Sequence, residues 1–228
     1  MKILLFDIDG TLLLTGGSGA RAMTRAFYEL FGVEDGLKGI TLSGMTDPII
    51  FDHACQKAGI EPTEEAHERF KQLYLTYLRE EIRKDNSQKR VLPGVKPLLQ
   101  QLSRQTGVHL GLLTGNYHEG ARIKLSHFDL DRFFPFGAFG DDDSDRNRLV
   151  PVALRRFHEQ MGEAVNGSDV WVIGDTPRDV ACAKPYGAKT MAVATGHYDE
   201  EELRQAEADV VVKDLSDVDR IVAVLQNS

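Results

Sequence analysis

Short apolar runs of strand length recur along the chain, and segments with helical periodicity separate most of them. Several runs are continuous rather than alternating, which is typical of strands that are buried on both faces of a parallel sheet. The pattern predicts an α/β fold: a doubly wound, Rossmann-like parallel sheet with right-handed crossovers. The expected strands are Ile3–Phe6, Val108–Leu113, Phe133–Phe139, Val170–Ile173, Thr190–Ala194 and Val210–Val212. The expected helices between them are Val95–Gln105, Glu119–His127, Leu149–Met161 and Pro177–Tyr186.

The stretch from about residue 18 to residue 90 breaks this alternation. It reads as three helices, Ser18–Phe31, Pro48–Lys57 and Thr63–Arg83, without a convincing strand. Ser18 is a possible cap for the first of them. We therefore expect a catalytic core formed by residues 1–14 and 91–228 and a helical cap domain, residues 15–90, inserted after the first strand. The segments 16–19 and 84–90 are the expected hinges.

Composition and charge narrow the classes of partner. The formal net charge of −8 at pH 7 argues against nucleic acid or an anionic membrane as the main partner. No apolar run approaches the 18 or so residues that would span a bilayer, and the start does not resemble a signal peptide. Cys55 and Cys182 lie far apart without metal-ligand spacing, which fits a reducing compartment. We expect a cytoplasmic protein, a monomer or a homodimer.

Polar and acidic residues follow three of the predicted strands at the point where each strand ends. In a parallel α/β sheet, ligands bind outside the carboxyl ends of the strands. These residues should therefore gather at one edge and form a site. They are Asp7, Asp9 and Thr11 after the first strand, Thr114, Gly115 and Asn116 after the second, and Gly174, Asp175 and Asp179 after the Val170–Ile173 strand.

Asp7 and Asp9 are separated by one residue, so an extended chain places their side chains on the same side, roughly 6–7 Å apart. Close carboxylates in a buried place repel each other, and a divalent cation relieves that repulsion. Mg²⁺ prefers carboxylate oxygens, water and phosphate, and Asp175 could supply a further ligand. A carboxylate can also act as a nucleophile and form an aspartyl-phosphate, while its neighbour moves the proton.

Three motifs carry a resemblance to a known family. DIDGT at 7–11, LLTGN at 112–116 and VIGDTPRDV at 172–180 resemble motifs one, two and four of the haloacid dehalogenase superfamily, in the same order. The helical insertion after the first motif resembles a type-1 cap. The chain is most similar to the subgroup of phosphoglycolate phosphatases and β-phosphoglucomutases.

The resemblance implies roles for the residues of motif one and motif two. Asp7 would be the nucleophile that attacks phosphorus. Asp9 would protonate the leaving oxygen and later activate water, and its backbone carbonyl would bind the metal. Thr114, with the backbone of Gly115 and Asn116, would hold the phosphoryl group.

In motif four, the resemblance implies that Asp175 ligates Mg²⁺, directly or through water, and that Asp179 supports the metal shell. The family usually carries a lysine in motif three, but the segment DDDSDRNRLVP, residues 141–151, places Arg146 and Arg148 there instead. A guanidinium can bridge phosphate and the Asp7 carboxylate. Arg146 is the first choice and Arg148 the second; alternatively, both arginines only balance the acidic loop.

Two features of the cap complete the candidate site. The segment LSGMTDPI, residues 42–49, resembles a loop that closes over the substrate in relatives, which makes Thr46 and Asp47 specificity candidates. Alternatively, Thr46 is only the N-cap of the next helix. The aromatic stripe Phe70, Tyr74 and Tyr77 has helical spacing and is expected to form the cap core rather than a substrate platform.

These observations predict a Mg²⁺-dependent phosphatase acting on a small phosphorylated metabolite, such as a phosphoglycolate-like compound or a sugar phosphate, through an aspartyl-phosphate on Asp7. A phosphomutase, which passes the phosphoryl group to a sugar, is the alternative. A 2-haloacid dehalogenase is less expected, because those enzymes need no metal and lack the second aspartate. A non-catalytic binding protein would have no chemical need for Asp7, Asp9 and Asp175 together.

Overall fold

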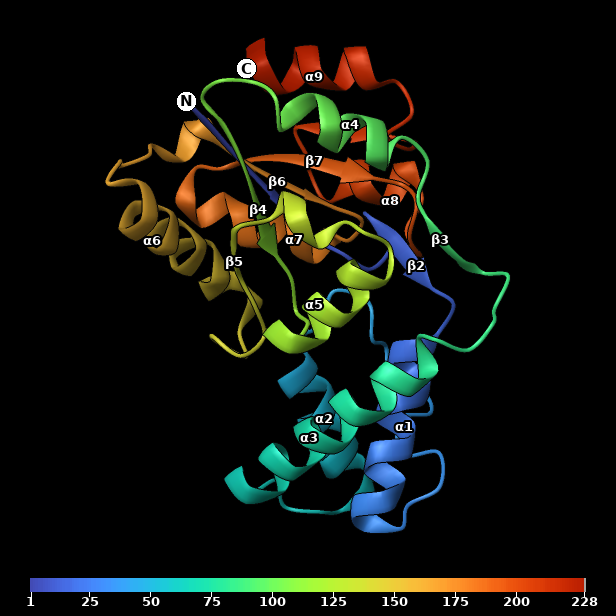
Figure 1. Ribbon diagram of the computed structural model, residues 1–228. Helices are drawn as coiled ribbons and strands as arrows, with labels where there is room; N and C mark the ends of the chain where they lie inside the picture. The colour runs from blue at the N-terminus through green and yellow to red at the C-terminus, as the bar shows by residue number, and fades with distance from the viewer. Residues whose placement is uncertain (228) are drawn as a thin grey trace.

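The computed structural model describes residues 1–227 and contains a parallel sheet with the strand order β5-β4-β1-β6-β7-β8 (Figure 1). All neighbouring strands in this sheet run parallel. The first strand along the chain lies in the middle, and the chain builds outward from it on both sides. The six strands are β1 (Lys2–Phe6), β4 (Val108–Leu113), β5 (Phe136–Ala138), β6 (Val170–Gly174), β7 (Lys189–Val193) and β8 (Val210–Val212).

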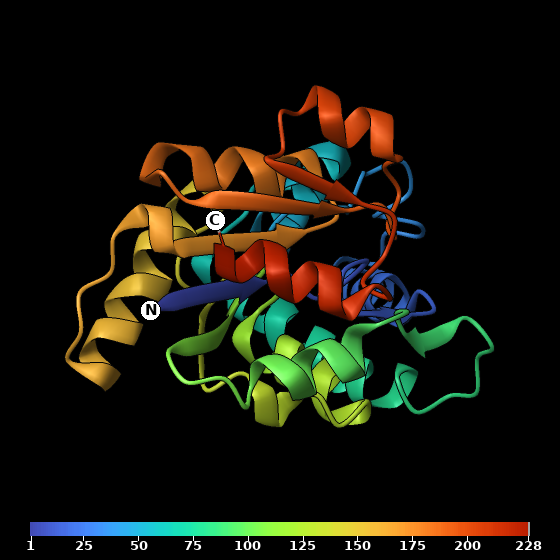
Figure 2. The same cartoon turned by 90° about the horizontal axis from the view of Figure 1, so that it is seen from above.

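Helices cover both faces of this sheet, because successive residues of a strand point to opposite sides. Leu4 and Phe6 of β1 pack in the cluster that contains α4, α5 and α9. Ile3 and Leu5 pack in the cluster that contains α6 and α7 on the other face (Figure 2). The predicted doubly wound α/β fold is therefore confirmed. The core helices are α4 (Val95–Leu102), α5 (His118–His127), α6 (Leu149–Met161), α7 (Pro177–Ala183), α8 (Glu200–Gln205) and α9 (Val218–Asn227).

Several predicted elements are shorter than the sequence pattern indicated, including the predicted helices at 63–83 and 95–105, which end at Glu81 and Leu102. The predicted strand at 133–139 is reduced to Phe136–Ala138, because Asp131–Phe133 form a 3₁₀ turn before it. The predicted helix at 177–186 ends at Ala183 and continues as the 3₁₀ turn Lys184–Tyr186. Pro185 explains this end, since proline has no N–H to donate and its ring clashes with the preceding turn of an α-helix.

The three predicted cap helices are present as α1 (Ser18–Phe31), α2 (Asp47–Ala58) and α3 (Glu64–Glu81), which lie together below the sheet in Figure 1. Their shared core includes the rings of Phe51 and Phe70, whose centroids are 4.8 Å apart. Ser18 is the first residue of α1 rather than its cap, which is Gly17 in the left-handed conformation. All three helices fall inside the predicted insertion, and its exact boundaries stay a prediction.

The sequence analysis missed a small antiparallel ribbon that joins cap and core. It consists of β2 (Leu13–Thr15) and β3 (Lys89–Val91), in which Leu14 pairs with Arg90. The expectation of no strand between about residues 18 and 90 was wrong for β3, and β2, just before that stretch, was not expected either. Strands of three residues are too short for a periodicity to stand out, and the two partners are separated by the whole cap.

Among residues 1–227, no helix is both long and apolar enough to cross a membrane.

A buried carboxylate ties the ends of the cap together where they meet this ribbon. The Glu81 side chain is 2% exposed and forms ion pairs with Arg21 and Arg25 of α1 and with Lys84. Burial opposes ionisation of Glu81, but hydrogen bonds from these three cations lower its pKa to about 2. Glu81 thus fixes the end of α3 against the beginning of α1.

We predict that Glu81→Gln lowers the free energy of unfolding at pH 7 by about 1–2 kcal/mol, a value reduced because the three cations are partly exposed. A carboxylate whose pKa is lowered on folding contributes its stability above its unfolded pKa and loses it in acid. The difference between wild type and variant should therefore shrink from pH 5 toward pH 2 in denaturant titrations. Glu80→Gln, which changes an exposed neighbour, is the control and should cost less than about 0.5 kcal/mol.

Candidate active site

The loops that follow β1, β4, β6 and β7 meet next to the cap and line a cavity of about 490 Å³. The strand register brings them level: Phe6 lies between Leu112 of β4 and Ile173 of β6, so the residues after these three strands are neighbours. The Asp7 amide continues the pairing and donates to the Ile173 carbonyl at 2.9 Å. The polar residues that follow these strands therefore lie together at the carboxyl edge of the sheet, as predicted.

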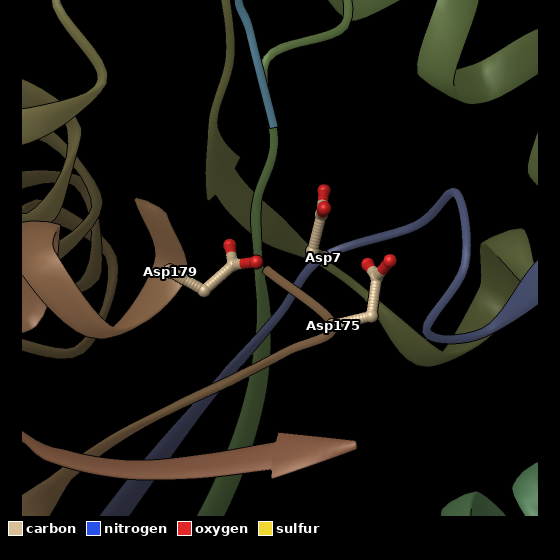
Figure 3. A group of neighbouring side chains, drawn as sticks. All are labelled: Asp7, Asp175 and Asp179. Carbon is tan, nitrogen blue, oxygen red and sulfur yellow. The ribbon is translucent and has the colours of Figure 1, made fainter. Parts of the chain in front are cut away.

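Three buried carboxylates form a compact cluster at this edge. Asp7, Asp175 and Asp179 each offer an oxygen, and these oxygens all lie within 4.8 Å of one another. Figure 3 shows Asp7, which follows β1, together with Asp175 and Asp179 from the stretch between β6 and the start of α7, with all three side chains gathered around one space. This donor set fits a hard divalent cation such as Mg²⁺. The Asp9 carboxylate, also predicted as a metal ligand, is not part of this cluster.

Two glycines make room for the Asp175 side chain. Gly10 has φ +85°, and a Cβ there would lie 2.3 Å from Asp175 Oδ2. A Cβ on Gly196 would lie 1.7 Å from the same oxygen. The Thr11 hydroxyl donates a hydrogen bond of 3.1 Å to Asp175 Oδ1. Gly10 and Thr11 of the first motif therefore position the carboxylate of the fourth.

Arg146 is the one arginine that reaches the cluster in the part of the chain that the structure describes. Its Nη2 lies 3.3 Å from Asp7 Oδ2 and also contacts Asp179 Oδ1. Arg146 is buried, whereas the Arg148 side chain is 71% exposed and pairs with Asp143 and Asp145 outside the cavity. Of the two predicted arginines, only Arg146 stands at the site. The 3₁₀ turn Arg146–Arg148 explains the difference, because it turns the two side chains in different directions.

The charge of this cluster is only partly compensated. Burial raises the pKa of Asp7 to about 6, against the lowering effect of Arg146, and the charges of Asp179 and Asp9 add to the rise. Burial and the charges of Asp179 and Asp7 raise the pKa of Asp175 well above its usual range. Three carboxylates thus share one guanidinium. A bound divalent cation would supply the missing positive charge.

Asp9 belongs to a second network, on the side of the cavity nearer the cap. Its Oδ2 accepts hydrogen bonds from Lys124 Nζ at 2.5 Å and from Asn116 Nδ2 at 2.9 Å. Asn116 also accepts from Lys124 at 2.6 Å and donates to the Thr114 hydroxyl at 2.8 Å. The Asp9 side chain remains 41% exposed. Asp9 is therefore held in a fixed orientation and still reaches the cavity.

The cap segment 42–49 packs directly on the loop 114–116. The Asp47 amide donates to the Gly115 carbonyl at 2.7 Å, and a Cβ on Gly115 would lie 2.1 Å from the Met45 carbonyl oxygen. The Asp47 carboxylate lines the cavity and accepts from the Tyr117 amide at 2.8 Å. Burial raises the pKa of Asp47 to about 7, although Lys124 opposes the rise.

Thr46, the other predicted specificity residue, is not among the residues that line the cavity. It is the N-cap residue of α2, as the alternative interpretation held, but its side chain makes no capping bond. Its hydroxyl instead donates to the Ser144 carbonyl at 2.7 Å. Thr46 thus links the cap to the loop that carries Arg146.

Among the residues that line the cavity, sequence reasoning did not single out Lys124 or the loop 195–197, and it placed Tyr74 in the cap core. The sequence pattern could have indicated Lys124, because it shares the buried face of α5 with Ala121 and Leu125. A lysine on a buried face needs an acidic or polar partner. The loop 195–197 follows the carboxyl end of β7, so it lies at the same edge of the sheet as the predicted site residues and could have been expected there. Tyr74 was expected in the cap core, where it does pack, and it also borders the cavity.

Comparison with known proteins agrees with this fold and site. A sequence model of the haloacid dehalogenase-like hydrolases matches residues 1–187. The chain belongs to this family of hydrolases.

Curated relatives and solved structures resemble nearly the whole chain. It is 26% identical to a phosphoglycolate phosphatase from Pseudomonas savastanoi pv. phaseolicola, covering 94% of this chain and 77% of that one. It is also 26% identical to pyrophosphatase PpaX from Halalkalibacterium halodurans, covering 98% of both. A β-phosphoglucomutase from Clostridium difficile shares the fold with a TM-score of 0.77 and 17% identity, covering 100% of this chain and 98% of that one.

We predict that Arg146→Met, measured in metal-free buffer, lowers the free energy of unfolding by about 3 kcal/mol or more, because it leaves buried carboxylates without their cation. Denaturant titration measures the loss. Arg148→Met is the matched control and should change stability by less than about 0.5 kcal/mol, since the Arg148 side chain is itself solvent-exposed. Equal losses in the two variants would contradict the different placement of the two arginines.

Proposed function

We propose that this protein is a Mg²⁺-dependent phosphatase that hydrolyses a small phosphorylated metabolite through an aspartyl-phosphate on Asp7. One observation carries the proposal: the Asp7 carboxylate lines the cavity beside the Arg146 guanidinium and shares a metal-like cluster with the carboxylates of Asp175 and Asp179. A nucleophile in this position can attack a phosphorus atom whose oxygens are held by positive charge.

Asp7 attacks phosphorus, so a bond forms between its carboxylate oxygen and phosphorus while the bond to the alcohol oxygen breaks. Arg146 orients Asp7 and offers N–H groups to the phosphate oxygens. Thr114, Gly115 and Asn116 line the same cavity as Asp7 and provide hydroxyl and amide donors for the transferring group. The Thr114 side chain is already fixed by its bond from Asn116, so these donors need no rearrangement.

Asp9 is the general acid and base in this proposal. It protonates the leaving alcohol oxygen, and as a carboxylate it then removes a proton from the water that attacks the aspartyl-phosphate. Its partial exposure supports this role, because an acid must reach both the leaving group and water. Lys124 and Asn116 hold the carboxylate toward the cavity.

Asp7, Asp175 and the Asp9 backbone carbonyl would hold Mg²⁺. Asp179 supports this shell, because its carboxylate contacts Arg146 and accepts from the Thr176 amide at 3.0 Å and the Thr176 hydroxyl at 2.8 Å. When bound, the ion supplies positive charge that offsets the buried carboxylates and the phosphate oxygens. The donor chemistry of the cluster, three oxygen ligands and no sulfur or imidazole, supports this choice of metal.

The cap encloses the substrate and limits its size. Met23, Leu42 and Ile50 provide apolar walls on the cap side of the cavity. A cavity of about 490 Å³ suits a small metabolite rather than a polymer. Enclosure keeps bulk water away while Asp7 attacks, and an open cap admits the water that completes turnover.

Hydrolysis is favoured over the phosphomutase alternative because the curated relatives at 26% identity carry the names phosphoglycolate phosphatase and pyrophosphatase. The mutase resemblance is one of fold, at 17% identity. A mutase passes the phosphoryl group to a sugar, so a sugar bisphosphate would accumulate during turnover. Release of inorganic phosphate without such an intermediate is the outcome expected here.

We predict that Asp7→Asn abolishes hydrolysis of p-nitrophenyl phosphate, with a loss of at least about a thousandfold in kcat, because an amide is not a nucleophile. The variant should keep its thermal unfolding midpoint, since asparagine has the same shape. Asp219→Asn, an exposed position on α9, is the control. Activity of the Asp7 variant within tenfold of wild type would remove Asp7 as the nucleophile.

We predict that Asp175→Asn raises the Mg²⁺ concentration needed for half-maximal activity by at least about tenfold. In wild type, saturating Mg²⁺ should raise the thermal unfolding midpoint, because a ligand that binds the folded state stabilises it. That rise should be lost or much smaller in the variant. If the metal titration and the thermal response are both unchanged, Asp175 is not a ligand.

A further inference from the structure

The Tyr74 hydroxyl has no partner among residues 1–227. Tyr74 lies on α3, its side chain is fully buried, and its Oη accepts and donates no hydrogen bond. Native proteins rarely leave a buried hydroxyl unpaired, because the lost bonds to water are not replaced. Burial, together with the nearby charges of Asp47 and Asp9, raises the pKa of this phenol. It therefore remains an O–H donor at neutral pH.

The missing side chain of Gly19 leaves a space in front of this hydroxyl. Gly19 lies in the first turn of α1 and lines the cavity. A Cβ at this position would lie 3.9 Å from Tyr74 Oη and 3.6 Å from Lys124 Nζ. The space therefore has the tyrosine hydroxyl on one side and the lysine ammonium on another.

Lys124 has a donor left for the same space. An ammonium group carries three N–H donors. In the described structure two of them are used, by Asp9 Oδ2 at 2.5 Å and by Asn116 Oδ1 at 2.6 Å. Lys124 is also buried, so solvent does not readily satisfy the third. Two donors with no acceptor thus face one gap in the cavity wall.

The position of the gap indicates what fills it. Lys124 contacts Asp9, the proposed acid for the leaving oxygen, so the gap lies next to the alcohol part of the substrate. The nearby cap wall formed by Met23 and Ile50 is apolar and suits a carbon chain. An oxygen atom carried by that chain would receive hydrogen bonds from both donors.

We propose that Tyr74 and Lys124 form a subsite, in the space left by Gly19, that binds a hydroxyl oxygen on the alcohol part of the substrate. The proposal rests on the proposed phosphatase function and specifies its substrate class: phosphate monoesters of alcohols that carry a second oxygen. Tyr74 is then a specificity-determining residue rather than only a part of the cap core.

The test compares matched pairs of substrates that differ by one hydroxyl: ethyl and 2-hydroxyethyl phosphate, propyl and 3-hydroxypropyl phosphate, and butyl and 4-hydroxybutyl phosphate. For wild type we expect kcat/KM to favour the hydroxylated member of at least one pair by about five- to tenfold. Tyr74→Phe removes only the unpaired oxygen and should abolish this preference, because it lowers kcat/KM for the hydroxylated member about five- to tenfold more than for the plain alkyl phosphate.

Gly19→Ala tests the space itself. The backbone of Gly19 is helical, and the nearest atoms to a Cβ there are at ordinary contact distance, so alanine should fold well and even favour the helix. Its methyl group occupies the space, and the hydroxyl preference should fall as it does in Tyr74→Phe. Tyr77→Phe is the matched control on α3, since the Tyr77 hydroxyl contacts Glu29 on the surface. It should keep the preference.

Each outcome is decisive. Absence of a hydroxyl preference in wild type, or a preference that survives in Tyr74→Phe or Gly19→Ala, overturns the subsite. If an internal water fills the gap instead of the substrate hydroxyl, one of these two results is expected. Hydrolysis of p-nitrophenyl phosphate by wild type separates the two proposals: activity on this ester without the preference rejects the subsite alone, and no activity on any ester rejects the phosphatase function and the subsite with it.

Discussion

The accumulation of negative charge at the carboxyl edge of the sheet is the constraint on which the rest of the structure depends. Asp7, Asp175 and Asp179 hold carboxylate oxygens within 4.8 Å of one another, with Arg146 as the partner that offsets part of their charge. Such a cluster is costly without a cation, so its geometry must be imposed by the fold. The parallel strands impose it, because β1 and β6 end at the same level.

The cap adds what the core cannot supply. Its segment 42–49 is anchored to the loop 114–116 through the Asp47 amide and the Gly115 carbonyl, and Glu81 holds the two ends of the insertion together. In the proposed function, the core carries the chemistry of phosphoryl transfer, and the cap carries the walls that meet the remainder of the substrate. In this division, the proposed subsite at Tyr74 connects the two, since Lys124 of the core and Tyr74 of the cap face the same gap.

Most of the architecture was predictable because it depends on local patterns. Continuous apolar runs predicted the six strands, and helical periodicity predicted α1 and α6 to the residue. The failures were local as well. Pro185 ended α7 early, and the ribbon of β2 and β3 is too short to be recognised without its partner. The motifs after the strands predicted the members of the acidic cluster, because the end of a parallel strand fixes its edge.

By itself, the sequence determined the fold class, the order of the motifs and the carboxylates that meet at the sheet edge, because these follow from periodicity and from the direction of parallel strands. Only the tertiary structure decided that Arg146 and not Arg148 contacts Asp7, that Lys124 pairs with Asp9, and that Tyr74 faces the cavity. These contacts join residues that are far apart in the chain. Their side-chain directions depend on how α3, α5 and the loop before α6 pack together, and no local pattern carries that information.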